Sequence, residues 1–170
     1  ITPSVFSALG VAPIKGRAFS DNEFGEGNDN VVVISERLWR RRFNSDSHLV
    51  GSQVSVNGNS CTVVGIMPAQ FEFPLPLFGV QGGTFAERAD MWKPIAFTKG
   101  DLESRGSRGL GVIGRLKPGV TIAQAQAEAD TIVANWYKQF PGNYEPTTKF
   151  GATVYPLHDL VVGGMRPALM

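Results

Sequence analysis

One stretch decides the fold: residues 31–43 read VVVISERLWRRRF. The first four residues are apolar and β-branched, which predicts a short buried strand. Ser35 ends this strand and can cap a helix that follows it directly. On that helix Leu38, Trp39 and Phe43 fall on one side, so they are predicted to face the core.

The same helix carries a dense group of arginines. Of the 16 basic residues of the chain, four lie within residues 37–42, namely Arg37, Arg40, Arg41 and Arg42. Two interpretations are open: a contact with an anion or phosphate, or the solvated face of a helix whose Trp39 and Phe43 are buried. Helical spacing favours the second interpretation. Arg42 lies nearest to the apolar side, and we expect it to make a specific structural contact.

Further elements are predicted on both sides of this stretch. Upstream, the Thr2-Pro3 pair predicts the start of a short helix, and Gly10 suits its end. Downstream, residues 53–67 alternate as two strands around Asn57-Gly58, a strong hairpin signal. Residues 89–97 resemble an edge strand, because Pro94 cannot donate to a central ladder.

The C-terminal half contains the clearest helix signal in the chain. Thr121 and Gln124 fit a capping box, and apolar residues then recur at helical spacing over about five turns. These residues are Ile122, Ala125, Ala129, Ile132, Val133, Trp136 and Phe140. Strands are predicted before this helix, at residues 110–116, and after it, at residues 149–157. The pattern as a whole predicts an α+β fold.

An uncharged segment, residues 73–86, is rich in Pro and Gly and is predicted to be a loop. Its large apolar residues include Phe73, Leu75, Leu77 and Phe78. Such a loop suits contact with a partner or with a membrane surface. The alternative is that it folds down over the hairpin.

Composition narrows the possible functions. The chain has 170 residues, of which 42% are hydrophobic, enough for one globular domain or two small lobes. Its net charge of +1 provides no strong positive potential that would attract nucleic acid. Cys61 is the only cysteine, and the two histidines, His48 and His158, lie far apart in the sequence. We therefore expect no metal site and no cofactor.

Catalytic motifs are also missing from the sequence. There is no P-loop and no G-x-S-x-G elbow, and the Gly-rich stretches lack the context of a dinucleotide site. A predicted loop contains the acidic residues Asp21, Glu23, Glu26 and Asp29. Water would surround their carboxylates there, so we expect no special acid–base role for them. We therefore expect a protein that is not an enzyme. The sequence also has no apolar run of the roughly 18 to 20 residues that span a bilayer.

Several blocks in order resemble one known family. They are VFSALGVAPIKGRAF (5–19), VVVISERLWRRRF (31–43), LVGSQVSVNGNSCTVVGIMP (49–68), ADMWKPIAF (89–97) and GRLKPGVTIAQAQAEADTI (114–132). Together they resemble the MacB-like periplasmic core domain of ABC transporter permeases of the MacB/FtsX type. The similarity is nearest to the permeases with duplicated halves seen in acidobacteria.

The resemblance implies a two-lobed α+β core domain, with residues 1–170 as a partial, excised ectodomain. A β-α-β lobe near the membrane would comprise residues 1–30 and 108–170. A smaller, strand-rich inserted lobe would comprise residues 31–97. The last residues look like the lead-in to a second membrane helix, so about 20 apolar residues are expected to follow Met170.

The resemblance also implies a function without catalytic residues. Such a domain lies on the periplasmic side of the inner membrane and couples ATP-driven motion to export or to the handling of lipid, lipoprotein or peptide. The expected partners are an ABC ATPase, reached through the membrane part, a permease dimer partner and a periplasmic adaptor. Two rivals stay open: a periplasmic protein whose loop 73–86 closes over a small ligand, and an esterase-like enzyme that uses His158.

Overall fold

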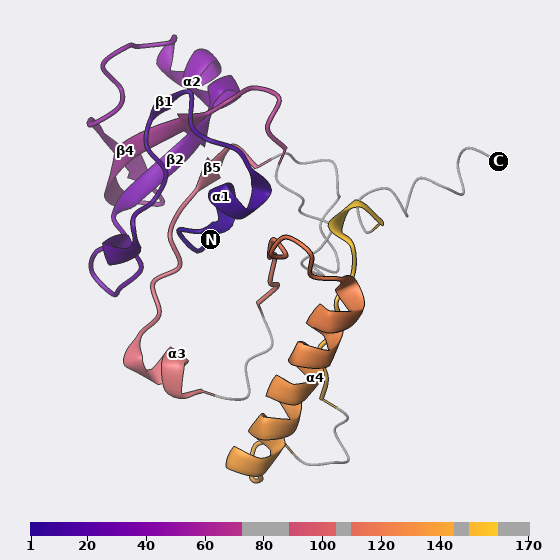
Figure 1. Ribbon diagram of the computed structural model, residues 1–170. Helices are drawn as coiled ribbons and strands as arrows, with labels where there is room; N and C mark the ends of the chain where they lie inside the picture. The colour runs from indigo at the N-terminus through magenta and orange to yellow at the C-terminus, as the bar shows by residue number, and fades with distance from the viewer. Residues whose placement is uncertain (73–88, 105–109, 145–149, 160–170) are drawn as a thin grey trace, which may run out of the picture. The chain divides into compact units, whose positions relative to one another are not determined.

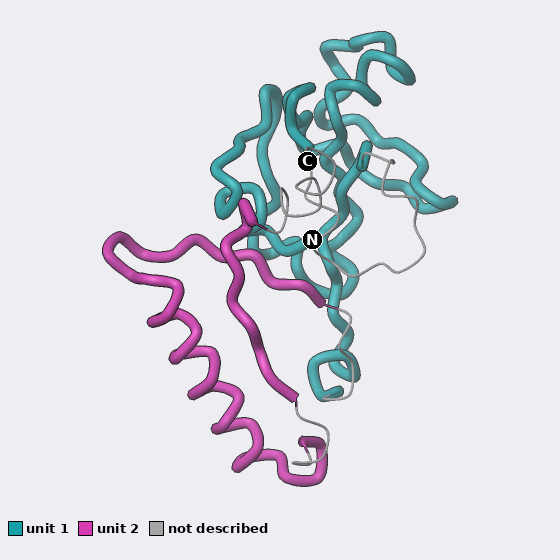
Figure 2. The backbone as a smooth tube through the Cα atoms, turned by 90° about the vertical axis from the view of Figure 1, so that its right-hand side faces the viewer, with its two compact units in different colours: residues 1–73, 84–104 teal, residues 74–83, 105–170 magenta. Residues whose placement is uncertain are grey.

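The computed structural model describes residues 1–72, 89–104, 110–144 and 150–159. The chain divides into two compact units, shown in Figure 2. Unit 1 comprises Ile1–Phe73 and Thr84–Ser104, and unit 2 comprises Pro74–Gly83 and Arg105–Met170.

Unit 1 is built around one mixed sheet (Figure 1). Its helices are α1 (Val5–Leu9), the 3-10 helix η1 (Asp21–Glu23), α2 (Glu36–Phe43) and α3 (Lys99–Glu103). Its strands are β1 (Lys15–Gly16), β2 (Val31–Ser35), β3 (Gln53–Val56), β4 (Asn59–Met67) and β5 (Met91–Trp92). The α+β fold class predicted from the sequence is confirmed.

Strand β4 is the centre of the sheet. The strand order is β1-β4-β2-β5, and β3 also pairs with β4. Strands β2 and β4 are parallel, whereas β1 and β3 run antiparallel to β4, and β5 runs antiparallel to β2. A tight turn cannot join two parallel strands. The chain therefore passes from β2 through α2 and returns along β3 before it forms β4.

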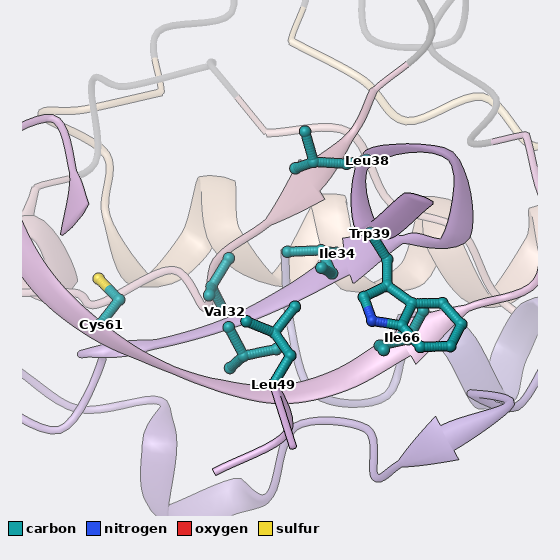
Figure 3. Close-up of a cluster of buried hydrophobic side chains, with 8 residues drawn as sticks. Val32, Ile34, Leu38, Trp39, Leu49, Cys61 and Ile66 are labelled. Atoms are coloured by element: carbon teal, nitrogen blue, oxygen red, sulfur yellow. The ribbon is translucent and has the colours of Figure 1, made fainter. Parts of the chain in front are cut away.

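Strand β2 is buried on both faces, which explains its continuous apolar run. Val32 and Ile34 belong to one core cluster, and Val33 belongs to another. The first cluster includes Leu38 and Trp39, so α2 covers this face of the sheet, as Figure 3 shows. The strand and the helix predicted from residues 31–43 are both confirmed.

The second cluster is organised around Phe6 of α1. The Phe6 ring lies 6.0 Å from the Phe19 ring, 5.8 Å from the Phe71 ring and 5.9 Å from the Trp92 ring, between centroids. Tilted and edge-on aromatic pairs of this kind are favourable beyond the area that they bury. Helix α1 therefore closes the face of the sheet opposite to α2.

Two short connections follow the sequence prediction. Asn57 and Gly58 both have positive φ, 51° and 84°, as the two-residue turn between β3 and β4 requires. Helix α1 ends at Gly10, which has a left-handed conformation with φ 74°. Its N-cap is Ser4 rather than Thr2, and the Ser4 side chain makes no capping hydrogen bond.

Two glycines let β1 approach β4 closely. A Cβ atom on Gly65 would lie 2.2 Å from the carbonyl oxygen of Arg17, and one on Gly16 would lie 2.2 Å from that of Val64. No side chain larger than hydrogen fits at such distances. The β1–β4 pairing therefore depends on both glycines.

Unit 2 contains the long helix α4 (Ile122–Gln139), which the sequence predicted. The capping box is formed: Gln124 N donates to Thr121 Oγ1 over 3.2 Å, and Thr121 N donates to Gln124 Oε1 over 2.8 Å. The predicted apolar face is covered only in part. Val133 is buried, but Ile122 and Ile132 are 37% and 49% exposed.

Two strands predicted in unit 2 are wrong within the described residues. Residues 110–116 form no strand, and Val112 is 93% exposed. Residues 150–155 likewise form no strand. Alternating apolar residues favour a strand, but a strand also needs a neighbour that accepts its backbone hydrogen bonds. In the described part of unit 2, no second strand provides that neighbour.

The edge strand predicted at residues 89–97 is shorter than expected, since β5 contains only Met91–Trp92. It does lie at the end of the sheet, and Pro94 follows it closely. The predicted lobe boundaries stay a prediction. In the structure, residues 1–30 belong to the same unit as β2, α2 and the hairpin.

Candidate functional site

Two of the four arginines of α2, Arg37 and Arg41, converge on one acidic residue, Asp90. Arg37 Nε and Nη2 lie 3.0 Å and 2.8 Å from Asp90 Oδ1, and Arg41 Nη2 lies 3.0 Å from Oδ2. Ser35 also donates to Asp90, from Oγ to Oδ1 over 2.6 Å and from its backbone N to the carbonyl oxygen over 2.8 Å. We call this group, Ser35, Arg37, Arg41 and Asp90, the Asp90 junction.

Burial alone raises the pKa of Asp90, because a charged carboxylate loses hydration there. The hydrogen bonds from Ser35 and Arg37, with the charges of Arg37 and Arg41, outweigh this effect. The pKa of Asp90 therefore lies below its usual value. The carboxylate stays charged and binds the arginines at neutral pH.

A second acidic residue ties the first turn of α2 to the chain after β4. Glu36 Oε1 pairs with Arg40 one turn later on α2, and Glu36 Oε2 accepts from the backbone N of Ala69 over 2.9 Å. Ala69 and Asp90 flank residues 73–88 in the sequence. The start of α2 therefore fixes the chain on both sides of that segment.

The structure corrects the role expected of Arg42. Its side chain is exposed, and within the described residues it makes no ion pair or side-chain hydrogen bond. The specific contacts belong instead to Arg37, Arg40 and Arg41. Proximity to the apolar side does not determine which arginine makes a specific contact, because the acidic partner is Asp90, far along the chain.

The aromatic residues of α2 lie where the sequence placed them. Trp39 is 9% exposed, and its indole N donates to the carbonyl oxygen of Asp46 over 2.8 Å. Lys15 Nζ lies 5.6 Å from the centroid of the Trp39 ring, within cation–π range. Phe43 packs against the same cluster and is partly buried.

Glu23 corrects the expectation that the acidic residues of the loop are all solvated. It is 7% exposed and accepts two hydrogen bonds from Arg17, of 2.9 Å and 2.6 Å. These bonds are the main reason that the pKa of Glu23 is lowered, against the opposing effect of burial, and the backbone N of Ser20 adds a bond of 2.8 Å. Glu23 also completes a capping box for η1 with Ser20.

An apolar hollow of about 410 Å³ lies beside α1. Its lining residues are Pro3, Phe6, Ser7, Gly10, Val11, Ala12, Pro13, Ala18 and Phe19. Ligand sites usually combine apolar walls with a few convergent polar groups. This lining offers one polar side chain, Ser7, whose hydroxyl donates to the carbonyl oxygen of Ser4. The hollow gives a small ligand little to fix its orientation.

The chemistry considered from the sequence is not assembled in the described residues. They contain no group of three or more His, Cys, Asp or Glu that could hold a metal ion. His158 Nδ1 lies 3.4 Å from Asp159 Oδ1, and both side chains are exposed. Cys61 is buried in the core. Phe73, Leu75, Leu77 and Phe78, the predicted contact residues, lie outside the described residues.

Unit 2 holds a residue whose contacts sequence reasoning missed. Gln126 of α4 donates from Nε2 to the carbonyl oxygen of Ala152 over 2.8 Å and accepts at Oε1 from the backbone N of Val154 over 2.8 Å. A polar residue on a helix face usually meets solvent, so no sequence pattern indicated this contact. Asp90 was missed for a different reason: its arginine partners lie more than 45 residues away along the chain.

Comparison with known proteins places the chain in a family. Residues 1–132 match the MacB-like periplasmic core domain. No curated protein matches the chain significantly. No helix in the described ranges is both long and apolar enough to cross a bilayer.

Two solved structures are similar to the chain. The periplasmic region of MacB from Actinobacillus actinomycetemcomitans is 15% identical with a TM-score of 0.46, covering 81% of this chain and 55% of that one. A domain of a putative permease protein from Porphyromonas gingivalis is 18% identical with a TM-score of 0.43, covering 81% of this chain and 51% of that one. The chain thus spans about half the length of each structure.

Proposed function

This chain belongs to the MacB-like periplasmic core domain family, and we propose that it is the non-catalytic, extracytoplasmic domain of an ABC transporter permease. In this role it passes conformational change driven by ATP to the periplasmic side of the inner membrane, for export or for handling lipid, lipoprotein or peptide. The observation that carries the proposal is the family match over residues 1–132. The proposed partners are a cognate ATPase, acting through the membrane part, a second permease subunit and a periplasmic adaptor.

The structure supports a part that transmits motion rather than one that catalyses a reaction. Unit 1 has a core on both faces of its sheet. The contact of Glu36 with Ala69 fixes the chain before residues 73–88, and the Asp90 junction fixes it after them. Tightly packed elements move as rigid bodies. The small-ligand alternative, in which the loop 73–86 closes over the ligand, stays a prediction, because those residues lie outside the described ranges. The hollow beside α1 does not add to it, since its lining is almost entirely apolar.

We also propose that Phe73, Leu75, Leu77 and Phe78 contact a periplasmic partner. Their support is the sequence, together with the anchoring of Ala69 and Asp90 on α2. A photo-crosslinking residue placed at Leu75 should capture a periplasmic protein in cells. Capture only of this permease, or of nothing, would contradict the proposal.

Location can be tested by cysteine labelling. Lys117 is exposed, whereas the native Cys61 is 1% exposed and should react little with the label. In cells with a permeabilised outer membrane, a membrane-impermeant maleimide should label Lys117→Cys in the full-length protein. The unsubstituted protein is the control. Labelling that requires rupture of the inner membrane would place the domain in the cytoplasm and overturn the proposal.

Coupling can be tested on the full-length permease with its ATPase in nanodiscs. Adding ATP and Mg²⁺ should change amide hydrogen exchange within this domain, which needs no knowledge of the transported molecule. Unchanged exchange across the whole domain would contradict conformational coupling.

A further inference from the structure

In unit 2, an extended stretch of chain lies along α4. We call residues 150–155 the strap. Gln126 contacts it at Ala152 and Val154, and Tyr137 contacts it at Phe150, where the Tyr137 hydroxyl donates to the carbonyl oxygen over 3.1 Å. The earlier residue of α4 meets the later part of the strap. The strap therefore runs antiparallel to the helix.

The Gln126 side chain takes the place of a neighbouring strand. In an extended chain, backbone groups of residues two positions apart point to the same side. One carboxamide can therefore serve both the carbonyl oxygen of Ala152 and the N–H of Val154. The second N–H of Gln126 is directed to Asp130 Oδ1 over 2.7 Å, which fixes the orientation of the carboxamide.

Packing holds the strap at one end, and Gln126 holds the other. At the first end, the Phe150 ring packs 5.0 Å from the Tyr144 ring and 5.9 Å from the Trp136 ring, between centroids. Toward the other end, Ala152 and Thr153 are exposed and Tyr155 is 59% exposed. Little apolar area is buried there, so the Gln126 hydrogen bonds carry the attachment.

We propose that Gln126 is a positioning residue that ties the strap to α4, so that a displacement of residues 150–159 is passed on to the helix. This inference rests on the proposed function, because it names where the motion enters α4. Without Gln126 the later part of the strap can move while α4 stays in place. With Gln126 the two move together.

The attachment can be measured on the 170-residue chain. Gln126→Ala removes both bonds to the strap, so amide exchange at Val154 should become about tenfold faster. Gln139→Ala is the matched control, because Gln139 lies on the same helix, is exposed and makes no side-chain hydrogen bond to a described residue. Equal exchange at Val154 in both variants would overturn the inference. Should Gln126→Ala fail to fold, Gln126→Glu keeps the acceptor for Val154 and loses the donor to Ala152.

Transmission is measured on the full-length permease with its ATPase in nanodiscs, by amide exchange with and without ATP. In the unsubstituted protein and in Gln139→Ala, residues 122–139 and 150–159 should both respond to ATP. In Gln126→Ala, residues 152–159 should respond while α4 around residue 126 does not, because only Phe150 stays attached to the helix, through Tyr137 and Trp136. A response around residue 126 that survives in Gln126→Ala overturns the inference and leaves the proposed function standing. No response anywhere in the unsubstituted domain overturns both.

Discussion

Asp90 illustrates how single residues hold unit 1 together. Its carboxylate accepts from Ser35, the N-cap of α2, and from Arg37 and Arg41 on the helix itself. The strand–helix junction is thereby joined to the chain just before β5. Exposed ion pairs contribute little, but a partly buried carboxylate with several donors contributes more.

At this scale we predict an order of importance among the arginines. Arg37→Ala should lower the free energy of unfolding by about 1 kcal/mol, because it removes two contacts to Asp90. Arg42→Ala should change it by less than about 0.5 kcal/mol, since Arg42 is exposed. Urea unfolding followed by circular dichroism measures both variants. If Arg42→Ala lost more unfolding free energy than Arg37→Ala, Arg42 would make the contact expected from the sequence. That result would contradict the role given to the Asp90 junction.

At the scale of the element, the sheet depends on how its strands approach one another. Strand β2 is parallel to β4 and buried on both faces, whereas β1 and β3 follow one another along the other edge of β4. The two-residue strand β1 has little length for pairing. Its position depends on the close backbone approach that glycine allows.

We predict that Gly65→Ala disrupts this approach. The added methyl group would lie 2.2 Å from the carbonyl oxygen of Arg17, so β1 must move away from β4. The expected loss is about 2–3 kcal/mol of unfolding free energy. Gly25→Ala is the control, since its nearest neighbour would be an Asn28 side-chain nitrogen at 3.9 Å. Thermal unfolding compares the midpoint temperatures of the two variants. Equal midpoints would show that β1 shifts without loss of stability and would contradict the prediction.

At the scale of the whole molecule, the two units are stabilised by different means. Unit 1 has two apolar clusters on one sheet, with the Arg17–Glu23 pair and the Asp90 junction at its margins. In the described part of unit 2, the buried apolar residues are Val133 and Tyr144. Unit 2 depends more on hydrogen bonds between α4 and the strap. The acid sensitivity expected from lowered carboxyl pKa values of partly buried groups therefore belongs to unit 1.

We predict that acid weakens unit 1 through Glu23 and Asp90. Both pKa values are lowered in the folded state, so the unfolded chain binds more protons in acid. Their contribution is complete above the unfolded pKa values of about 4 and is lost as pH falls through the lower folded values. Unfolding free energy should therefore fall below about pH 5.

Glu23→Gln tests this origin, with Glu26→Gln as the exposed control. Glu23→Gln should flatten the decline of unfolding free energy between about pH 5 and pH 2, and Glu26→Gln should leave it unchanged. Chemical unfolding at a series of pH values measures the slope. The same slope in both variants would show that the Arg17–Glu23 pair does not cause the acid sensitivity.

The sequence by itself determined the elements whose signals are local. The run of β-branched residues gave β2, Ser35 gave the start of α2, Asn57-Gly58 gave the hairpin, and Thr121 with Gln124 gave the start of α4. Each signal acts within a few positions of the chain. Propensity, capping and turn geometry are therefore enough to fix it.

Only the tertiary structure decided the contacts between distant parts of the chain. It paired Asp90 with Arg37 and Arg41 rather than Arg42, and it buried Glu23 against Arg17. It also left residues 110–116 without a strand and gave the strap a side chain, Gln126, in place of a neighbouring strand. Such choices depend on which groups the topology brings within hydrogen-bonding distance, and no pattern within one short segment contains that information.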